Sequence, residues 1–68
     1  MSDGWVKIGT YQEIYLVEMA KSFLEEEGII CSILNKKDTS YIMIGEIELL
    51  VRNKDVMSAK YIIEKLKL

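Results

Sequence analysis

The sequence predicts a single α+β domain, with two layers, the element order β-α-β-β-α and an antiparallel sheet that carries both helices on one face. Segments with alternating apolar residues, typical of strands, precede and follow a longer segment with apolar residues at the helical period. A second helical segment ends the chain, and 68 residues leave room for one core. A right-handed crossover between the first two strands then places both helices on the same face.

The first elements are predicted to be a strand over residues 5–9 and a helix over residues 11–27. Thr10 and Glu13 have the spacing of a capping box, so we expect the helix to begin between them. Gly28 can adopt the left-handed conformation that ends a helix. The helix face expected to pack on the sheet carries Leu16, Val17, Ala20, Phe23 and Leu24, whereas Tyr11 and Tyr15 are expected to point elsewhere.

The second strand is predicted over residues 29–35 and has apolar residues on both faces. A strand that is apolar on both faces is typical of the centre of a sheet, so we expect it to be the central strand. Cys31 lies among isoleucines and is interpreted as a small core residue, because no nearby cation is evident that would favour a thiolate.

The second half of the chain predicts a loop or short strand over residues 36–45, a strand over residues 46–52 and a helix over residues 54–67. The strand should pair antiparallel with the one before it, and Asn53 is a suitable N-cap for the helix. The buried stripe of this helix is expected to comprise Val56, Ala59, Ile63 and Leu66, with Ile62 beside it.

The predicted sheet face turned away from the helices, here named the outer face, has several large apolar residues and no third layer to cover them. Such a surface favours self-association or a protein partner. The alternative is that residues 41–44 fold back and cover it. The candidate interaction surface comprises Trp5, Lys7, Ile30, Leu34, Tyr41 and Leu50, with Ser32 and Glu48 on the same face.

The polar run after the second strand contains Lys36, Lys37, Thr39 and Ser40, which supply hydrogen-bond donors for an acidic partner. The same donors suit a small anionic ligand, although no glycine-rich phosphate loop accompanies them. A solvated loop is the simpler interpretation.

Catalytic and metal sites are not expected. The chain has no histidine and one cysteine, which argues against zinc sites, histidine-based catalysis and disulfides within the chain. Glu46 and Glu48 could lie on one strand face, but charges beside a hairpin are usually solvated, so we interpret them in that way. We therefore expect no enzyme and no cofactor.

The composition also bears on partners and location. A net charge of −2 gives no basic patch for nucleic acid. Residues 1–10 have no cationic start followed by an apolar segment, so we expect no signal peptide, and no apolar run approaches the roughly 20 residues of a membrane span. We expect a cytoplasmic protein without contact to a membrane.

Several segments together resemble a known family. Residues 5–8 read Trp-Val-Lys-Ile, residues 24–29 read Leu-Glu-Glu-Glu-Gly-Ile, and residues 35–41 and 45–51 continue the similarity over nearly the whole chain. The chain resembles the small bacterial domain named putative prokaryotic signal-transducing protein.

The resemblance implies a ferredoxin-like fold, similar in shape to the PII nitrogen-signalling proteins. Those proteins place a regulatory loop between the second and third strands, where residues 35–45 lie here, and form trimers with their sheets turned inward. No nucleotide-binding residue of the PII proteins maps onto this chain, so the resemblance implies no cofactor.

Overall fold

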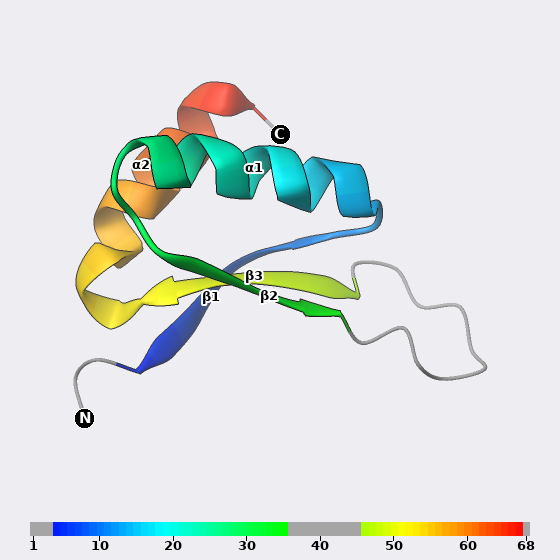
Figure 1. The fold of residues 1–68 in the computed structure, drawn as a ribbon, viewed down its shortest axis with the longest axis horizontal. Helices are drawn as coiled ribbons and strands as arrows, with labels where there is room; N and C mark the ends of the chain where they lie inside the picture. Colours follow the sequence, from blue (N-terminus) through cyan, green and yellow to red (C-terminus); the bar gives the residue numbers. More distant parts are fainter. Residues whose placement is uncertain (1–3, 36–45, 68) are drawn as a thin grey trace.

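The computed structural model describes residues 4–35 and 46–67. The described elements follow the order β1 (Trp5–Tyr11), α1 (Ile14–Glu26), β2 (Cys31–Asn35), β3 (Ile47–Arg52) and α2 (Val56–Leu66), with a 3-10 turn, η1 (Asn53–Asp55), before α2. The three strands form an antiparallel sheet, and both helices lie on one face of it (Figure 1). The predicted α+β fold with the order β-α-β-β-α is confirmed. The predicted short strand within residues 36–45 falls outside the described residues.

The strand order is β1-β3-β2, so the central strand is β3 and the prediction that β2 lies in the centre is wrong. β3 pairs antiparallel with β2 from Cys31↔Val51 to Asn35↔Ile47, as expected. On its other side β3 pairs with β1, from Trp5↔Arg52 to Tyr11↔Ile47. An edge strand can also be apolar on both faces, when one face packs under helices and the other is left exposed. The periodicity of the sequence does not distinguish such an edge strand from a central strand.

The core lies between the sheet and the helices. Ile47, Leu49 and Val51 on β3 are buried almost completely, which confirms the predicted alternation of this strand. Burial of each such side chain contributes about 1.5–3 kcal/mol relative to exposure. The other buried apolar residues are Tyr11, Val17, Ala20, Leu24, Ile29 and Ala59, and Ile8, Cys31, Val56, Ile62 and Ile63 pack against this cluster.

β1 is longer than predicted because the pairing register shifts between Lys7 and Gly9, which leaves Ile8 as a bulge. Beyond the bulge Tyr11 lies opposite Ile47 and is buried in the core, so the prediction that Tyr11 belongs to the helix surface is wrong. A Cβ on Gly9 would lie 3.3 Å from the Tyr11 hydroxyl oxygen, so glycine makes room for this ring.

The predicted capping box is also wrong. Thr10 is part of β1 and lies opposite Glu48, while the N-cap of α1 is Glu13, which makes no side-chain capping hydrogen bond. Pairing with β3 extends the strand through the residues that a local pattern assigned to the helix start. Tertiary pairing here overrides a local capping signal.

The end of α1 follows the prediction. Gly28 has φ +84°, its N–H donates to the Glu25 carbonyl at 3.0 Å, and the Ile29 N–H donates to the Leu24 carbonyl at 3.0 Å. These two bonds form a Schellman motif, which satisfies carbonyls at the helix end. Ile29 then enters the core, so the same turn that ends the helix directs the chain into β2.

The helix faces differ from the expectation at two places. Phe23 is 41% exposed, because the buried stripe of α1 is narrower than predicted and consists of Val17, Ala20 and Leu24. Asn53 lies in η1 and does not cap α2; its N–H donates to the Gly4 carbonyl at 2.9 Å, and Asp55 precedes α2 without a side-chain capping bond. The backbone bond to Gly4 ties the start of β1 to the end of β3.

Gly28→Ala should destabilise the fold by about 1–2 kcal/mol, because an L-residue is strained in the left-handed region. Gly4→Ala is the matched control: nothing lies within 4 Å of its Cβ position, and its φ is not positive. Urea unfolding followed by circular dichroism measures both. Equal stability of the two variants would contradict the assigned role of Gly28.

Leu49→Ala should cost about 2–5 kcal/mol, because it leaves a cavity in the core. Its neighbour Leu50 points to the opposite face and is half-buried, so Leu50→Ala should cost clearly less. Thermal and urea unfolding of the two variants compare the two faces of β3 directly. A larger loss from Leu50→Ala would contradict the assignment of the faces.

Candidate functional site

The outer face of the sheet is the candidate site, and it lies opposite the two helices (Figure 1). Residues directly opposite each other in an antiparallel pair point to the same face, so the register defines its membership. Three rows of side chains cross it: Trp5 and Arg52; Lys7, Leu50 and Ser32; and Thr10, Glu48 and Leu34.

Apolar side chains on this face remain open to solvent. Trp5 is 44% exposed and Leu34 is 45% exposed, at opposite edges of the sheet. Leu50 lies between them on the central strand and is half-buried. Among the described elements, both helices pack on the other face, so none of them covers these three residues.

Charged groups of both signs accompany the apolar ones. Lys7 Nζ lies 3.7 Å from Glu48 Oε2, with side chains 54% and 14% exposed. The Arg52 guanidinium lies over the Trp5 ring, 4.6 Å from its centroid. Contacts of this kind at a surface contribute roughly 0–1 kcal/mol each. They therefore orient side chains more than they stabilise the fold.

The structure brings four predicted site residues together on the outer face: Trp5, Lys7, Leu34 and Leu50. Ile30 precedes β2 and is 64% exposed. It lines a hollow of about 210 Å³ with Gly28, Arg52, Lys54 and Asp55. The remaining predicted residues, Tyr41, Lys36, Lys37, Thr39 and Ser40, lie outside the described residues, as does the segment 41–44 proposed as a cover.

Two members of the outer face were not predicted. Arg52 continues the two-residue alternation past Leu50, so periodicity alone could have identified it. Thr10 reaches this face only because the bulge at Ile8 shifts the register of β1. Gly9 is the signal in β1 that could have indicated the shift, because glycine within a strand often marks a bulge.

The prediction that Glu46 is a solvated charge is wrong. It is 7% exposed, and its Oε2 accepts no hydrogen bond within the part of the chain that the structure describes. Glu48 is also largely covered, with its side chain 14% exposed. A buried carboxylate oxygen without a donor is costly, so the position of Glu46 is set by the surrounding chain and not by solvation.

Cys31 packs against the core from β2, in agreement with its interpretation as a core residue, although it is only half-buried. Its thiol donates to the Ile29 carbonyl at 3.6 Å. Burial raises the pKa of the Cys31 thiol to about 11, and the nearby Glu25 carboxylate acts in the same direction. A protonated thiol is a poor nucleophile.

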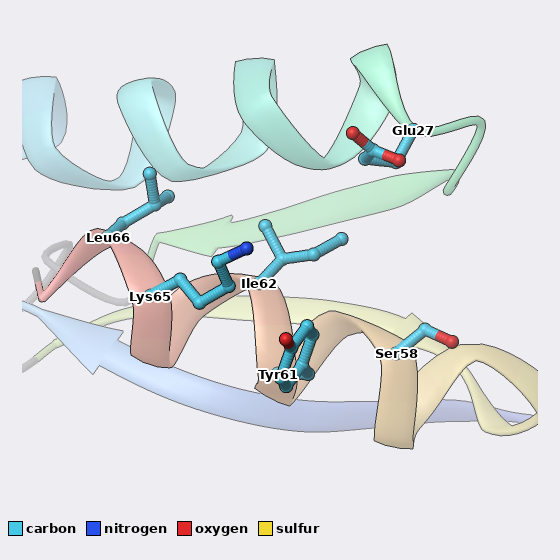
Figure 2. Close-up of a pocket in the computed structure, with 6 residues that line it drawn as sticks. All are labelled: Glu27, Ser58, Tyr61, Ile62, Lys65 and Leu66. Atoms are coloured by element: carbon cyan, nitrogen blue, oxygen red, sulfur yellow. The ribbon is translucent and has the colours of Figure 1, made fainter.

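A groove of about 400 Å³ separates the end of α1 from α2 (Figure 2). Glu27, the C-cap of α1, lies on one side of the groove, and α2 contributes Tyr61, Ile62 and Lys65 on the other, with Ser58 and Leu66 at its ends. Tyr61 is 62% exposed, and Lys65 Nζ lies 5.4 Å from the centroid of its ring. Its polar groups are solvated, which is typical of a shallow surface groove.

Four further large side chains, Tyr11, Tyr15, Met57 and Tyr61, do not gather on one surface. Tyr11 is buried in the core, whereas Tyr15 lies in the first turn of α1 and Met57 in the first turn of α2, with exposed fractions of 62% and 83%. Tyr61 belongs to the groove.

A family model described as putative prokaryotic signal transducing protein matches residues 5–67. The match covers every described helix and strand and almost the whole chain. The chain belongs to this family. The resemblance found in the sequence is thereby confirmed. Comparisons with curated proteins and with solved structures find no match.

The family's description names signal transduction and specifies no ligand or reaction. Within residues 4–35 and 46–67, no three His, Cys, Asp or Glu side chains are grouped so that they could hold a metal ion. None of the described helices is long and apolar enough to span a membrane.

Cys31 of this family member should react slowly with iodoacetamide. A rise of the pKa from 9.0 to about 11 leaves roughly a hundredfold less thiolate at pH 8 in the folded chain than in urea. Because the unfolded chain loses this proton first, stability should fall as the pH rises from 9.0 towards about 11. Alkylation rates followed by mass spectrometry measure the effect.

Glu25→Gln should speed the alkylation, since the Glu25 carboxylate raises the pKa of the thiol. Glu26→Gln is the control, because Glu26 is not among the groups that shift Cys31. Equal alkylation rates in folded and unfolded protein would contradict the assigned environment of Cys31.

Proposed function

We propose that this protein is a non-catalytic interaction module of a signalling system, and that the outer face of its sheet binds the same face of a second copy. The observation that carries the proposal is the diagonal of apolar side chains Trp5, Leu50 and Leu34 across the three rows of the outer face, which no described element covers. The family's description supports a role in signalling. The expectations of a cytoplasmic location and of no cofactor belong to the same proposal.

The energetics favour a contact at this face. At about 25 cal/mol per Å², burial of a few hundred Å² of apolar surface supplies several kcal/mol before the cost of association. Trp5 is the expected anchor, because tryptophan is enriched among the residues that dominate binding energy. Its ring is already oriented by the Arg52 guanidinium, so little side-chain entropy remains to be lost.

The charges on the face suit a second copy. Lys7 and Arg52 carry positive charge and Glu48 carries negative charge, so a two-fold contact can place Lys7 near Glu48 of the second copy. Lys7 is more than half exposed and can change its partner without moving the backbone. Opposite charges across such a contact give specificity more than affinity.

The alternative of a small anionic ligand depends on Lys36, Lys37, Thr39 and Ser40. These residues lie outside the described part of the chain, so no structural observation favours that function.

Sedimentation equilibrium over a roughly hundredfold range of concentration tests the proposal. The wild type should associate reversibly, and Trp5→Lys/Leu50→Lys should form a smaller assembly, with at least about tenfold weaker self-association. Emission of Trp5, the one tryptophan, should shift to the blue as the wild type is concentrated.

Met57→Lys/Tyr61→Lys is the matched control, because it replaces two exposed apolar residues on the helix layer. It should associate like the wild type. Circular dichroism establishes that each variant is folded. A wild type that stays monomeric, or an outer-face variant that associates as strongly as the wild type, overturns the proposal.

A further inference from the structure

β2 is an edge strand of unusual composition. Within the described chain it pairs with β3 on one side, and no other described strand lies on its second side. A strand at an edge presents a row of backbone N–H and C=O groups to any chain that approaches. Proteins usually protect such edges with charged residues, prolines or bulges.

The two edges of this sheet differ in that protection. β1 has a bulge at Ile8 and a charged residue at Lys7. Residues 31–34 of β2 read Cys-Ser-Ile-Leu, with no charge, no proline and an unbroken register against β3. Among the described elements, nothing in the composition or register of β2 blocks strand pairing at its edge, whereas the β1 edge has both a bulge and a charge.

We propose that β2 pairs antiparallel with β2 of a second copy about a two-fold axis, which joins two three-stranded sheets into one sheet of six strands. An axis at Ile33, the middle residue of β2, gives the longest pairing. Ile33 then lies beside Ile33 of the second copy on the core face, and Ser32 lies opposite Leu34 of the second copy on the outer face.

The occupant is a second copy because the strand is complementary to itself. Antiparallel pairing about a two-fold axis places uncharged residues opposite uncharged residues along all of β2, with no like charges facing each other. The pairing also accounts for the composition of β2. A strand with apolar residues on both faces belongs in the interior of a sheet, and in the six-stranded sheet β2 has a neighbour on each side.

Ser32 and Leu34 lie on both surfaces, but the edge contact is made by backbone N–H and C=O groups and the outer-face contact by side chains, so the inference does not depend on the proposed function. Either contact alone gives a dimer. Both together give a tetramer in which two six-stranded sheets pack by their outer faces, about 10 Å apart, with the helices outside.

Ser32→Lys/Leu34→Lys tests the edge. The two-fold axis would place each new lysine directly opposite a lysine of the second copy, and like charges in that position are destabilising. Within its own sheet the lysine at 34 lies beside Glu48, which makes the variant compatible with the fold. Leu34 also belongs to the outer face, so this variant is compared with Trp5→Lys/Leu50→Lys. Both variants should form smaller assemblies than the wild type in sedimentation equilibrium, but only Ser32→Lys/Leu34→Lys should lose the concentration-dependent protection of the β2 amides.

Thr10→Lys is the matched control on the other edge. Lys7 and the new lysine then occupy on β1 the same two rows that the lysines at 32 and 34 occupy on β2, so each variant has a pair of lysines on the outer face at one edge of the sheet. This control should retain β2 pairing. If Thr10→Lys abolishes β2 pairing as fully as the β2 variant does, the loss is caused by charge on the outer face and not by charge at the β2 edge, and the inference fails.

Amide hydrogen exchange of residues 31–34 in the wild type provides a readout that does not require a variant. Alternate amides of β2 should become protected as the protein is concentrated, and the outer-face variant Trp5→Lys/Leu50→Lys should keep this protection. Exchange in β2 that does not change with concentration overturns the inference, even if the outer-face contact is found. If the wild type forms only dimers and its β2 amides become protected, the result supports pairing at the β2 edge and excludes the contact between outer faces.

Discussion

Every other part of the fold depends on the position of β3 in the centre of the sheet. Its backbone pairs on both sides, with β1 and with β2, and its three inward residues are almost completely buried. Both helices contact it from the same face of the sheet. A chain of this size has one core, and β3 is the element that contacts both other described strands and both described helices.

A domain of 68 residues cannot cover all of its apolar surface with its own chain. The two helices cover one face of the sheet, and the core is complete on that side. The outer face and the β2 edge are the surfaces that the described elements leave open. Both have a composition suited to contact with protein: apolar anchors and mixed charges on the face, and an uncharged strand at the edge. This arrangement is consistent with membership of a family described by signalling and not by a reaction.

The polar groups of the outer face act on specificity more than on stability. Lys7, Glu48 and Arg52 make contacts that are partly exposed, and such contacts contribute little net free energy. Their value lies in deciding which surface can dock and in which orientation. The one thiol lies on the opposite face, half-buried against the core and protonated at neutral pH, so it adds no reactivity to the site.

The sequence by itself determined the element order, the inward alternation of β3, the helix end at Gly28 and six members of the outer face. These features depend on periodicity and on the conformations open to single residues, which are local properties of the chain. Only the tertiary structure decided that β2 lies at an edge, that the bulge at Ile8 carries Tyr11 into the core and Thr10 to the outer face, and that Phe23 stays exposed. Strand order and register are set by hydrogen bonds between segments far apart in the chain, and a local pattern is compatible with more than one such pairing.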